Sequence, residues 1–185
     1  MVTILSLWLP ILIASVLVYV VATMLYMVTP LHFKDFAKLQ DEDAVIDVLR
    51  SQEIKQGQYM FPGMESKKEW TSPEWTDKAN RGPVGLLFIH PPGIGMSKQL
   101  IFQGIFVLAI SIVAGYMGSA SLPPGAEYLD VFQVVGTAAF LAHSAGPFTD
   151  SIWYGFSWRM TWIRVFEGLL FALLTAGVFG WLWPQ

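Results

Sequence analysis

Four long apolar stretches constrain this sequence most, because each is long enough to cross a lipid bilayer. A membrane-spanning helix needs about 20 mostly apolar residues. The stretches run over residues 4–28, 100–118, 128–147 and 165–183. The first has no basic leader and exceeds the apolar core of a signal peptide, so we expect it to be retained as a helix. The sequence therefore predicts an all-α integral membrane protein, with one membrane domain of four transmembrane helices.

The overall composition agrees with a membrane location. Hydrophobic residues make up 54% of the chain and charged residues 14%, whereas a soluble domain is roughly a quarter charged. The mean hydropathy is +0.51. This balance excludes a disordered chain, a basic nucleic-acid binder and most soluble enzymes. The absence of cysteine excludes disulfides, thiolate catalysis and cysteine-ligated clusters.

A polar insert over residues 31–99 separates the first two stretches. Asp41–Glu53 is predicted to form a helix, with acids at its N-terminus and Gly57 as a stop beyond it. One face of that helix is an apolar stripe that needs burial, formed by Val45, Val48, Leu49 and Gln52.

The second half of the insert predicts two further elements. Ser72 followed by Pro73 is typical of a helix start, because serine caps the end and proline fits the first turn. The run Val84–Ile89 lies between turn residues and predicts a strand that pairs with Tyr59–Phe61 as a small hairpin.

The basic residues predict the orientation. Every lysine and arginine lies in the insert, except Arg159 and Arg164 between the third and fourth stretches. The positive-inside rule places both loops in the cytoplasm and both termini in the periplasm of a bacterial inner membrane. Two aromatic belts agree, and we expect segment 148–164 to lie along the inner surface. The outer belt is Trp8, Tyr128, Trp181 and Trp183, and the inner belt is Trp153, Tyr154, Trp158 and Trp162.

Small residues at a spacing of four predict where helices pack closely. The fourth stretch carries Gly168, Ala172, Ala176 and Gly180, and the second carries Ser111, Gly115 and Ser119. One interpretation is a tight bundle of the last three helices with the first at its edge. The other is that a small-residue face docks on another membrane protein.

Few ionisable groups lie in the apolar stretches. Glu167 follows Arg164 by three residues, which predicts an ion pair at a helix start. The alternative is a proton-relay carboxylate, for which the sequence supplies no chain of titratable partners. Glu127 and Asp130 flank the start of the third stretch, where a helix N-terminus favours acids.

The three histidines differ in their surroundings. His32 lies at the inner membrane edge and His90 in a proline-rich turn, and neither has the spacing of a metal site. His143 is the best single candidate for binding a cofactor, because small residues around it would admit a haem or bacteriochlorophyll to a neutral imidazole. The alternative is a histidine that bonds a backbone carbonyl or water. The sequence itself requires no cofactor and predicts no metal site.

Several stretches resemble a family of small uncharacterised four-helix bacterial inner-membrane proteins. The stretches that carry the resemblance are His32–Phe36 with Glu42-Asp43, Gly57–Pro62, Arg81–Val84, Leu122–Leu129, Ser151–Tyr154 and Ala172–Gly177. They cover most of the chain in order. The resemblance implies four helices with a cytoplasmic insert, and it implies no activity, cofactor or site.

The leading hypothesis for function is a non-catalytic accessory subunit of a larger membrane assembly, with photosynthetic or respiratory bioenergetic complexes as the expected hosts. Its partners would be integral membrane proteins and lipids, and no nucleic acid. The motivation is the small-residue faces, the tryptophan-rich boundaries and the lack of a nucleophile elbow, phosphate loop or zinc motif. One alternative is a pigment- or haem-binding protein that uses His143. Another is a small transporter or lipid enzyme that uses Glu167 and Arg164.

Overall fold

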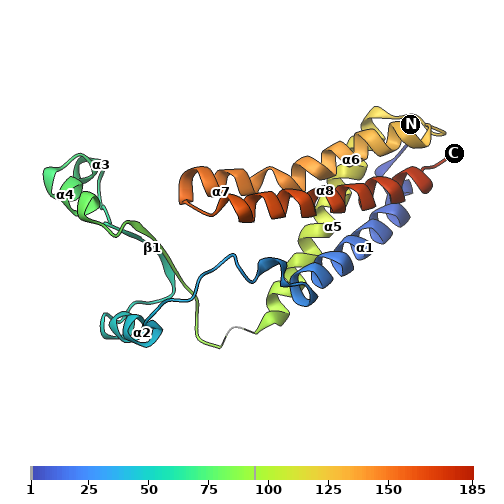
Figure 1. Cartoon of the computed structure of the whole chain (residues 1–185). Coiled ribbons are helices and arrows are strands. Elements are labelled where there is room, and N and C mark those ends of the chain that lie inside the picture. Colours follow the sequence, from blue (N-terminus) through green and yellow to red (C-terminus); the bar gives the residue numbers. More distant parts are fainter. Residues whose placement is uncertain (1, 94) are drawn as a thin grey trace. The chain divides into compact units, whose positions relative to one another are not determined.

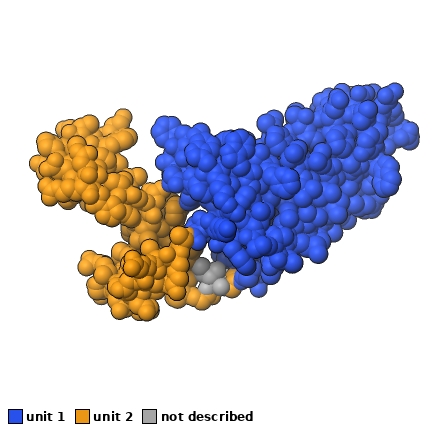
Figure 2. All heavy atoms as spheres, viewed as in Figure 1, with its two compact units in different colours: residues 1–36, 96–185 blue, residues 37–95 orange. Residues whose placement is uncertain are grey.

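The computed structural model describes residues 2–93 and 95–185, and most of them are helical. The chain forms two compact units, a helical unit up to Phe36 and from Met96 onward, and an insert unit over Ala37–Gly95 (Figure 2). The elements in chain order are η1 (Ile4–Leu7), α1 (Trp8–Val28), η2 (Pro30–His32), α2 (Glu42–Ser51), β1 (Gly57–Phe61), α3 (Lys67–Trp70), α4 (Pro73–Arg81), β2 (Gly85–Ile89), α5 (Met96–Ser121), α6 (Tyr128–Ser144), α7 (Gly146–Tyr154) and α8 (Trp158–Trp181) (Figure 1).

Three helices are long and apolar enough to cross a membrane, namely Ile4–Val28, Met96–Ser121 and Trp158–Trp181. They coincide with the first, second and fourth predicted stretches, and such helices are compatible with a membrane-embedded protein. The third stretch differs. Its helix α6 has 17 residues and ends at Ser144, and the chain continues into α7 at Gly146. Four membrane crossings therefore remain a prediction.

Helix α1 packs between α5 and α8, and α6 packs against the same two helices from another side. Leu7, Ala14 and Val18 from the first helical segment are fully buried. The prediction that the first helix lies at the edge of a bundle of the other three is therefore wrong. Its small Ala14 and Ser15 allow it a close approach to its neighbours.

The small residues of α8 face α6 within the chain. A methyl group added at Gly136 of α6 would lie 3.0 Å from the Cβ of Ala176. One added at Gly180 would lie 2.7 Å from the ring of Tyr128. The face that could have docked on another protein is thus used to bring α6 and α8 together.

Segment 148–164 is not one continuous stretch but two helices joined by a turn. Helix α7 covers its first part, Gly155 turns the chain with a φ of +72°, and α8 begins at Trp158. The Ser157 hydroxyl caps α8 by accepting a hydrogen bond from the Met160 amide at 3.2 Å. The result is a helical hairpin, in which α7 packs against α8 (Figure 1).

One end of the helical unit is closed by hydrogen bonds to the C-terminal residues. The indole of Trp183 donates to the Pro123 carbonyl at 3.0 Å. The Gly125 amide donates to the Pro184 carbonyl at 2.8 Å. These bonds fasten the loop between α5 and α6 to the end of α8.

The insert unit holds the predicted helices and strands. Asp41 caps α2 by accepting from the Ala44 amide at 3.1 Å, and Ser72 caps α4 by accepting from the Trp75 amide at 3.1 Å. Strands β1 and β2 pair antiparallel with Tyr59 opposite Leu87. These predictions are confirmed, but α2 ends at Ser51, so Gly57 opens β1 rather than stopping the helix.

The insert unit has no core of its own. Of its described residues, 37–93 and 95, none is buried. Many of its apolar side chains remain exposed, among them Val48 at 61%, Trp70 at 55% and Val84 at 60%, and the others are half-buried. In the predicted apolar stripe of α2, Val45 and Val48 therefore stay exposed, and Leu49 is half-buried.

Candidate functional site

The polar cluster of the helical unit begins where α1 ends. Thr29 has extended backbone angles, and Pro30 starts the short turn η2 that holds His32. The ring of Tyr26 in the last turns of α1 stacks on the imidazole of His32, with centroids 4.3 Å apart. This stacking fixes the imidazole against the end of α1.

The imidazole of His32 bridges two carboxylates. Its Nδ1 lies 2.7 Å from Oδ2 of Asp35 and its Nε2 lies 2.9 Å from Oε1 of Glu167. The side chains are shielded from solvent, with 9%, 3% and 10% exposure for His32, Asp35 and Glu167. Carboxylates accept hydrogen bonds, so both ring nitrogens donate only when the histidine carries its positive charge.

Arg159 completes the cluster from the first turn of α8. Its Nη1 donates to Oδ1 of Asp35 at 2.6 Å, and its Nη2 donates to the Leu31 carbonyl at 2.9 Å. The cluster thus contains two carboxylates, one guanidinium and one imidazole. With His32 protonated, positive and negative charges balance.

The pKa of His32 is raised from 6.5. Burial alone would lower the pKa, but hydrogen bonds with Asp35 and Glu167 and the charges of both carboxylates outweigh that effect. The charged imidazole therefore persists to higher pH in the folded protein. Chemically the cluster can fasten the turn after α1 to α8, and it can take up or release one proton there.

The prediction that Glu167 pairs with Arg164 is wrong. Glu167 bonds His32, while Arg164 lies 3.5 Å from Asp150 of α7. The two residues share one helix, but Glu167 faces the end of α1 and Arg164 faces α7. The long-range partners therefore replace the local pair.

Among residues 2–93 and 95–185, no group of three His, Asp or Glu side chains is placed to hold a metal ion. His90 is exposed just after β2. Glu127 precedes α6 and Asp130 lies in its first turn, as the charge argument for helix starts predicts.

His143 lies near the end of α6, between α5 and α8. Its ring meets Phe171 of α8 edge-on at 5.3 Å and Phe106 of α5 at 6.3 Å between centroids. Neither imidazole nitrogen has a hydrogen-bond partner in the described part of the chain. The neighbouring Ser144 hydroxyl is buried and likewise has no partner there.

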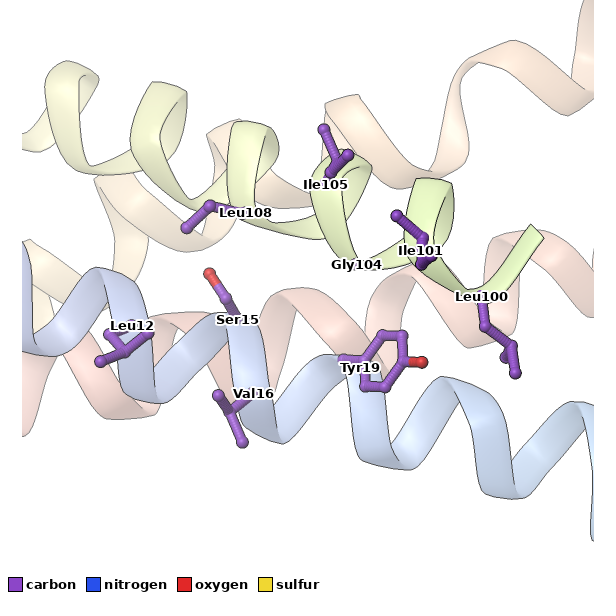
Figure 3. A pocket seen from close by; sticks show the side chains of 9 residues that line it. All are labelled: Leu12, Ser15, Val16, Tyr19, Leu100, Ile101, Gly104, Ile105 and Leu108. Carbon is purple, nitrogen blue, oxygen red and sulfur yellow. The ribbon is translucent and has the colours of Figure 1, made fainter. Parts of the chain in front are cut away.

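An apolar groove of about 430 Å³ runs between α1 and α5. Figure 3 shows its walls, which are Leu12, Ser15, Val16 and Tyr19 of α1 and Leu100, Ile101, Gly104, Ile105 and Leu108 of α5. The Ser15 hydroxyl donates to the Ile11 carbonyl of its own helix at 2.6 Å. The groove therefore has apolar walls with few polar groups, which suits hydrocarbon better than a polar substrate.

Sequence reasoning missed the bridge from His32 to Glu167 and the contact of Arg159 with Asp35. The spacing of His32 and Asp35 by three residues was the only local signal. The remaining contacts join residues more than 120 positions apart, with separations of 135 and 124. No family model, curated protein or solved structure matches the chain. The resemblance to four-helix inner-membrane proteins therefore stays a prediction.

Proposed function

We propose that the chain is a non-catalytic accessory subunit of a larger membrane assembly, and that the insert unit is the part that binds the partner. The observation that carries this proposal is the lack of any buried residue among residues 37–93 and 95. A two-stranded sheet with short helices needs further packing to be stable in water. A partner surface would supply it.

The exposed apolar side chains of the insert unit come from several elements. Val45 and Val48 belong to α2, Tyr59 and Met60 to β1, and Trp70 to α3. Exposed apolar surface of this kind is typical of protein interfaces. Within the proposal, the insert faces the cytoplasm of a bacterial inner membrane, both termini face the periplasm, and a bioenergetic complex is the expected host. The distribution of lysine and arginine supports that orientation.

The test is a purification of the C-terminally tagged full chain from native membranes in mild detergent. We expect a particle well above 20.7 kDa with a partner in fixed stoichiometry. Val48→Ser and Val84→Ser should reduce the amount of that partner, because both side chains are exposed and neither supports the fold. Gln56→Ser, also in the insert and exposed, is the matched control and should retain it.

Two outcomes would contradict this function. One is a chain that purifies alone, as a monomer or small homo-oligomer. The other is a stoichiometric partner that all three variants retain equally, which would place the interface outside the insert unit.

A pigment- or haem-binding role for His143 is a second candidate. It rests on the imidazole that has no hydrogen-bond partner in the described part of the chain. The same purification tests it, because a bound macrocycle gives a visible absorption band. That band should disappear in His143→Leu and persist in His90→Leu. A colourless preparation, or a band unchanged by His143→Leu, removes this candidate.

A further inference from the structure

The α7–α8 hairpin, defined here as residues 146–164, places polar groups in its seam. The hydroxyls of Ser151 in α7 and Thr161 in α8 lie 2.5 Å apart. Thr161 also bonds the Pro147 carbonyl at 3.2 Å. Ser151 is 8% exposed and Thr161 is 2% exposed, so these polar groups are shielded from the surroundings.

A charge pair joins the same two helices. Asp150 of α7 and Arg164 of α8 approach to 3.5 Å, with about a third of each side chain exposed. The hairpin therefore pairs Asp150 with Arg164 internally, which lowers the cost of placing both near hydrocarbon, and its other base, Arg159, bonds Asp35 outside the hairpin.

The outer surface of the hairpin is aromatic and apolar. Its exposed members are Ile152 at 60%, Trp153 at 78%, Tyr154 at 55%, Trp158 at 51% and Trp162 at 59%. We call these five residues the aromatic collar. A hairpin that folds in water buries such side chains and leaves serine, threonine and charged groups outside. In this hairpin Ser151 and Thr161 are buried while five large aromatic and apolar side chains are exposed, a pattern that favours surroundings other than bulk water.

We propose that the aromatic collar lies in the headgroup layer of a phospholipid bilayer and holds the hairpin at the membrane boundary. Tryptophan and tyrosine concentrate at this depth, because each ring combines an apolar body with a polar N–H or O–H group. The collar consists mainly of these two residue types.

The collar continues the exposed apolar face of α8. Trp158, Trp162, Phe166, Leu169 and Leu173 follow one another at spacings of three or four residues, and all are exposed. This spacing places them along one side of the helix. Because α8 is long and apolar enough to cross a membrane, the stripe passes from hydrocarbon-facing leucines to boundary tryptophans without interruption.

Helix lengths place the collar at the boundary. About 20 helical residues cross the hydrocarbon core, so counting back from Trp181 at the opposite end of α8 leads to about Thr161. The same count from Tyr128 through α6 and into α7 leads to about Phe148. Both positions lie just inside the tip of the hairpin, and the collar begins within a few residues of each. This inference concerns lipid and does not depend on the partner proposed for the insert unit.

The chain has no cysteine, so single spin labels can be attached without removing native thiols. We would label Ile152→Cys in the collar, Val113→Cys in α5 and Val48→Cys in α2, whose side chains are 60%, 56% and 61% exposed. The full chain is reconstituted into vesicles of phosphatidylcholine and phosphatidylglycerol. Collisions with oxygen and with a nickel chelate then report the depth of each label.

We expect the label at position 152 within about 10 Å of the phosphate level, between the other two. The label at 113 should favour oxygen and the label at 48 should favour nickel. Adding Trp153→Ser and Trp158→Ser to Ile152→Cys should lower the oxygen-to-nickel ratio, because the anchoring rings are gone. The label at 113 reports whether the variant still inserts.

Three results would overturn the proposal. The label at 152 could be as accessible to nickel as the label at 48, which would place the hairpin in water. It could match the label at 113, which would place the hairpin in hydrocarbon. It could also be shielded from both reagents, which would mean that protein, here another copy of the chain, covers the collar.

Discussion

The Nε2 atom of His32 lies 2.9 Å from Oε1 of Glu167, and this contact joins the turn after α1 to α8 across 135 positions of sequence. Because α8 packs on α6, this contact also links the end of α1 to the α6–α8 pair. The same imidazole bonds Asp35, which Arg159 holds in turn. Four side chains, two from the segment after α1 and two from α8, thus form one continuous series of contacts in the order Glu167, His32, Asp35 and Arg159.

The stability of the helical unit should decrease as pH rises through the pKa of His32. That pKa is raised from 6.5 in the folded state, so the bridge contributes fully below 6.5 and is lost above the raised value. The groups that face the imidazole are Asp35 and Glu167, with Tyr26 stacked on the ring. The measurement is thermal unfolding in detergent from pH 5.5 to 9.

His32→Gln supplies the comparison for this pH series. Glutamine can donate a hydrogen bond but carries no proton equilibrium in this range, so the variant should lose the descending step of the wild-type profile. His90 and His143 remain in both proteins, so their contributions to the pH dependence cancel when the two profiles are subtracted. Parallel profiles for the two proteins would show that His32 does not carry the pH dependence.

A double-mutant cycle should reveal coupling between His32 and Glu167 and little between Glu167 and Arg164. We expect about 1–2 kcal/mol for the first pair, because the substitutions interrupt one charge-assisted bond. The changes in unfolding free energy caused by Glu167→Gln and Arg164→Gln should add up in the double variant to within about 0.5 kcal/mol. Unfolding free energies in detergent give both cycles. Strong coupling of Glu167 with Arg164 would contradict the structure and support the ion pair that the sequence predicts.

Gly168→Ala should destabilise the contact of α6 with α8. An added methyl group would collide with the Ser144 hydroxyl and would lie 3.2 Å from the backbone carbon of His143. Overpacking of this kind costs about 1–3 kcal/mol. Gly146→Ala is the matched control, because nothing lies within 4 Å of its added methyl. Equal melting temperatures for the two variants would contradict the close approach.

Trp183→Phe should lower stability more than Trp181→Phe. Trp183 is 4% exposed and donates to the Pro123 carbonyl, whereas Trp181 is 86% exposed. Loss of a buried hydrogen bond costs about 1–3 kcal/mol, and an exposed substitution changes little. The melting temperatures of the two single variants check this difference. If Trp181→Phe lowered the melting temperature more, the result would contradict the role of Trp183 in fastening the loop before α6.

The elements that the sequence predicted well are those set by local chemistry. The apolar run from Ile4 to Val28 forms a helix over that range, Ser72 caps α4, and the strand at Gly85–Ile89 pairs with β1. In each case the deciding interactions lie within a short stretch of chain, or between two strands with matching apolar runs.

The predictions that failed depend on contacts between distant residues. Glu167 has a nearby arginine in the sequence, but the fold brings His32 closer. The position of segment 148–164 at the inner surface stays a prediction, but the sequence did not predict that Gly155 turns the chain so that α7 and α8 share a polar seam. No pattern within either segment specifies the neighbour that decides its geometry.

The coreless insert unit also bears on how long an unassembled copy of the chain would survive in a cell. Side chains such as Val48 and Trp70 are what chaperones and proteases of protein quality control recognise as incompletely folded. Under the proposed function, a copy that binds its partner would hide them, and a surplus copy would be degraded. The level of this chain would then follow the level of the proposed host complex without any dedicated control of its synthesis.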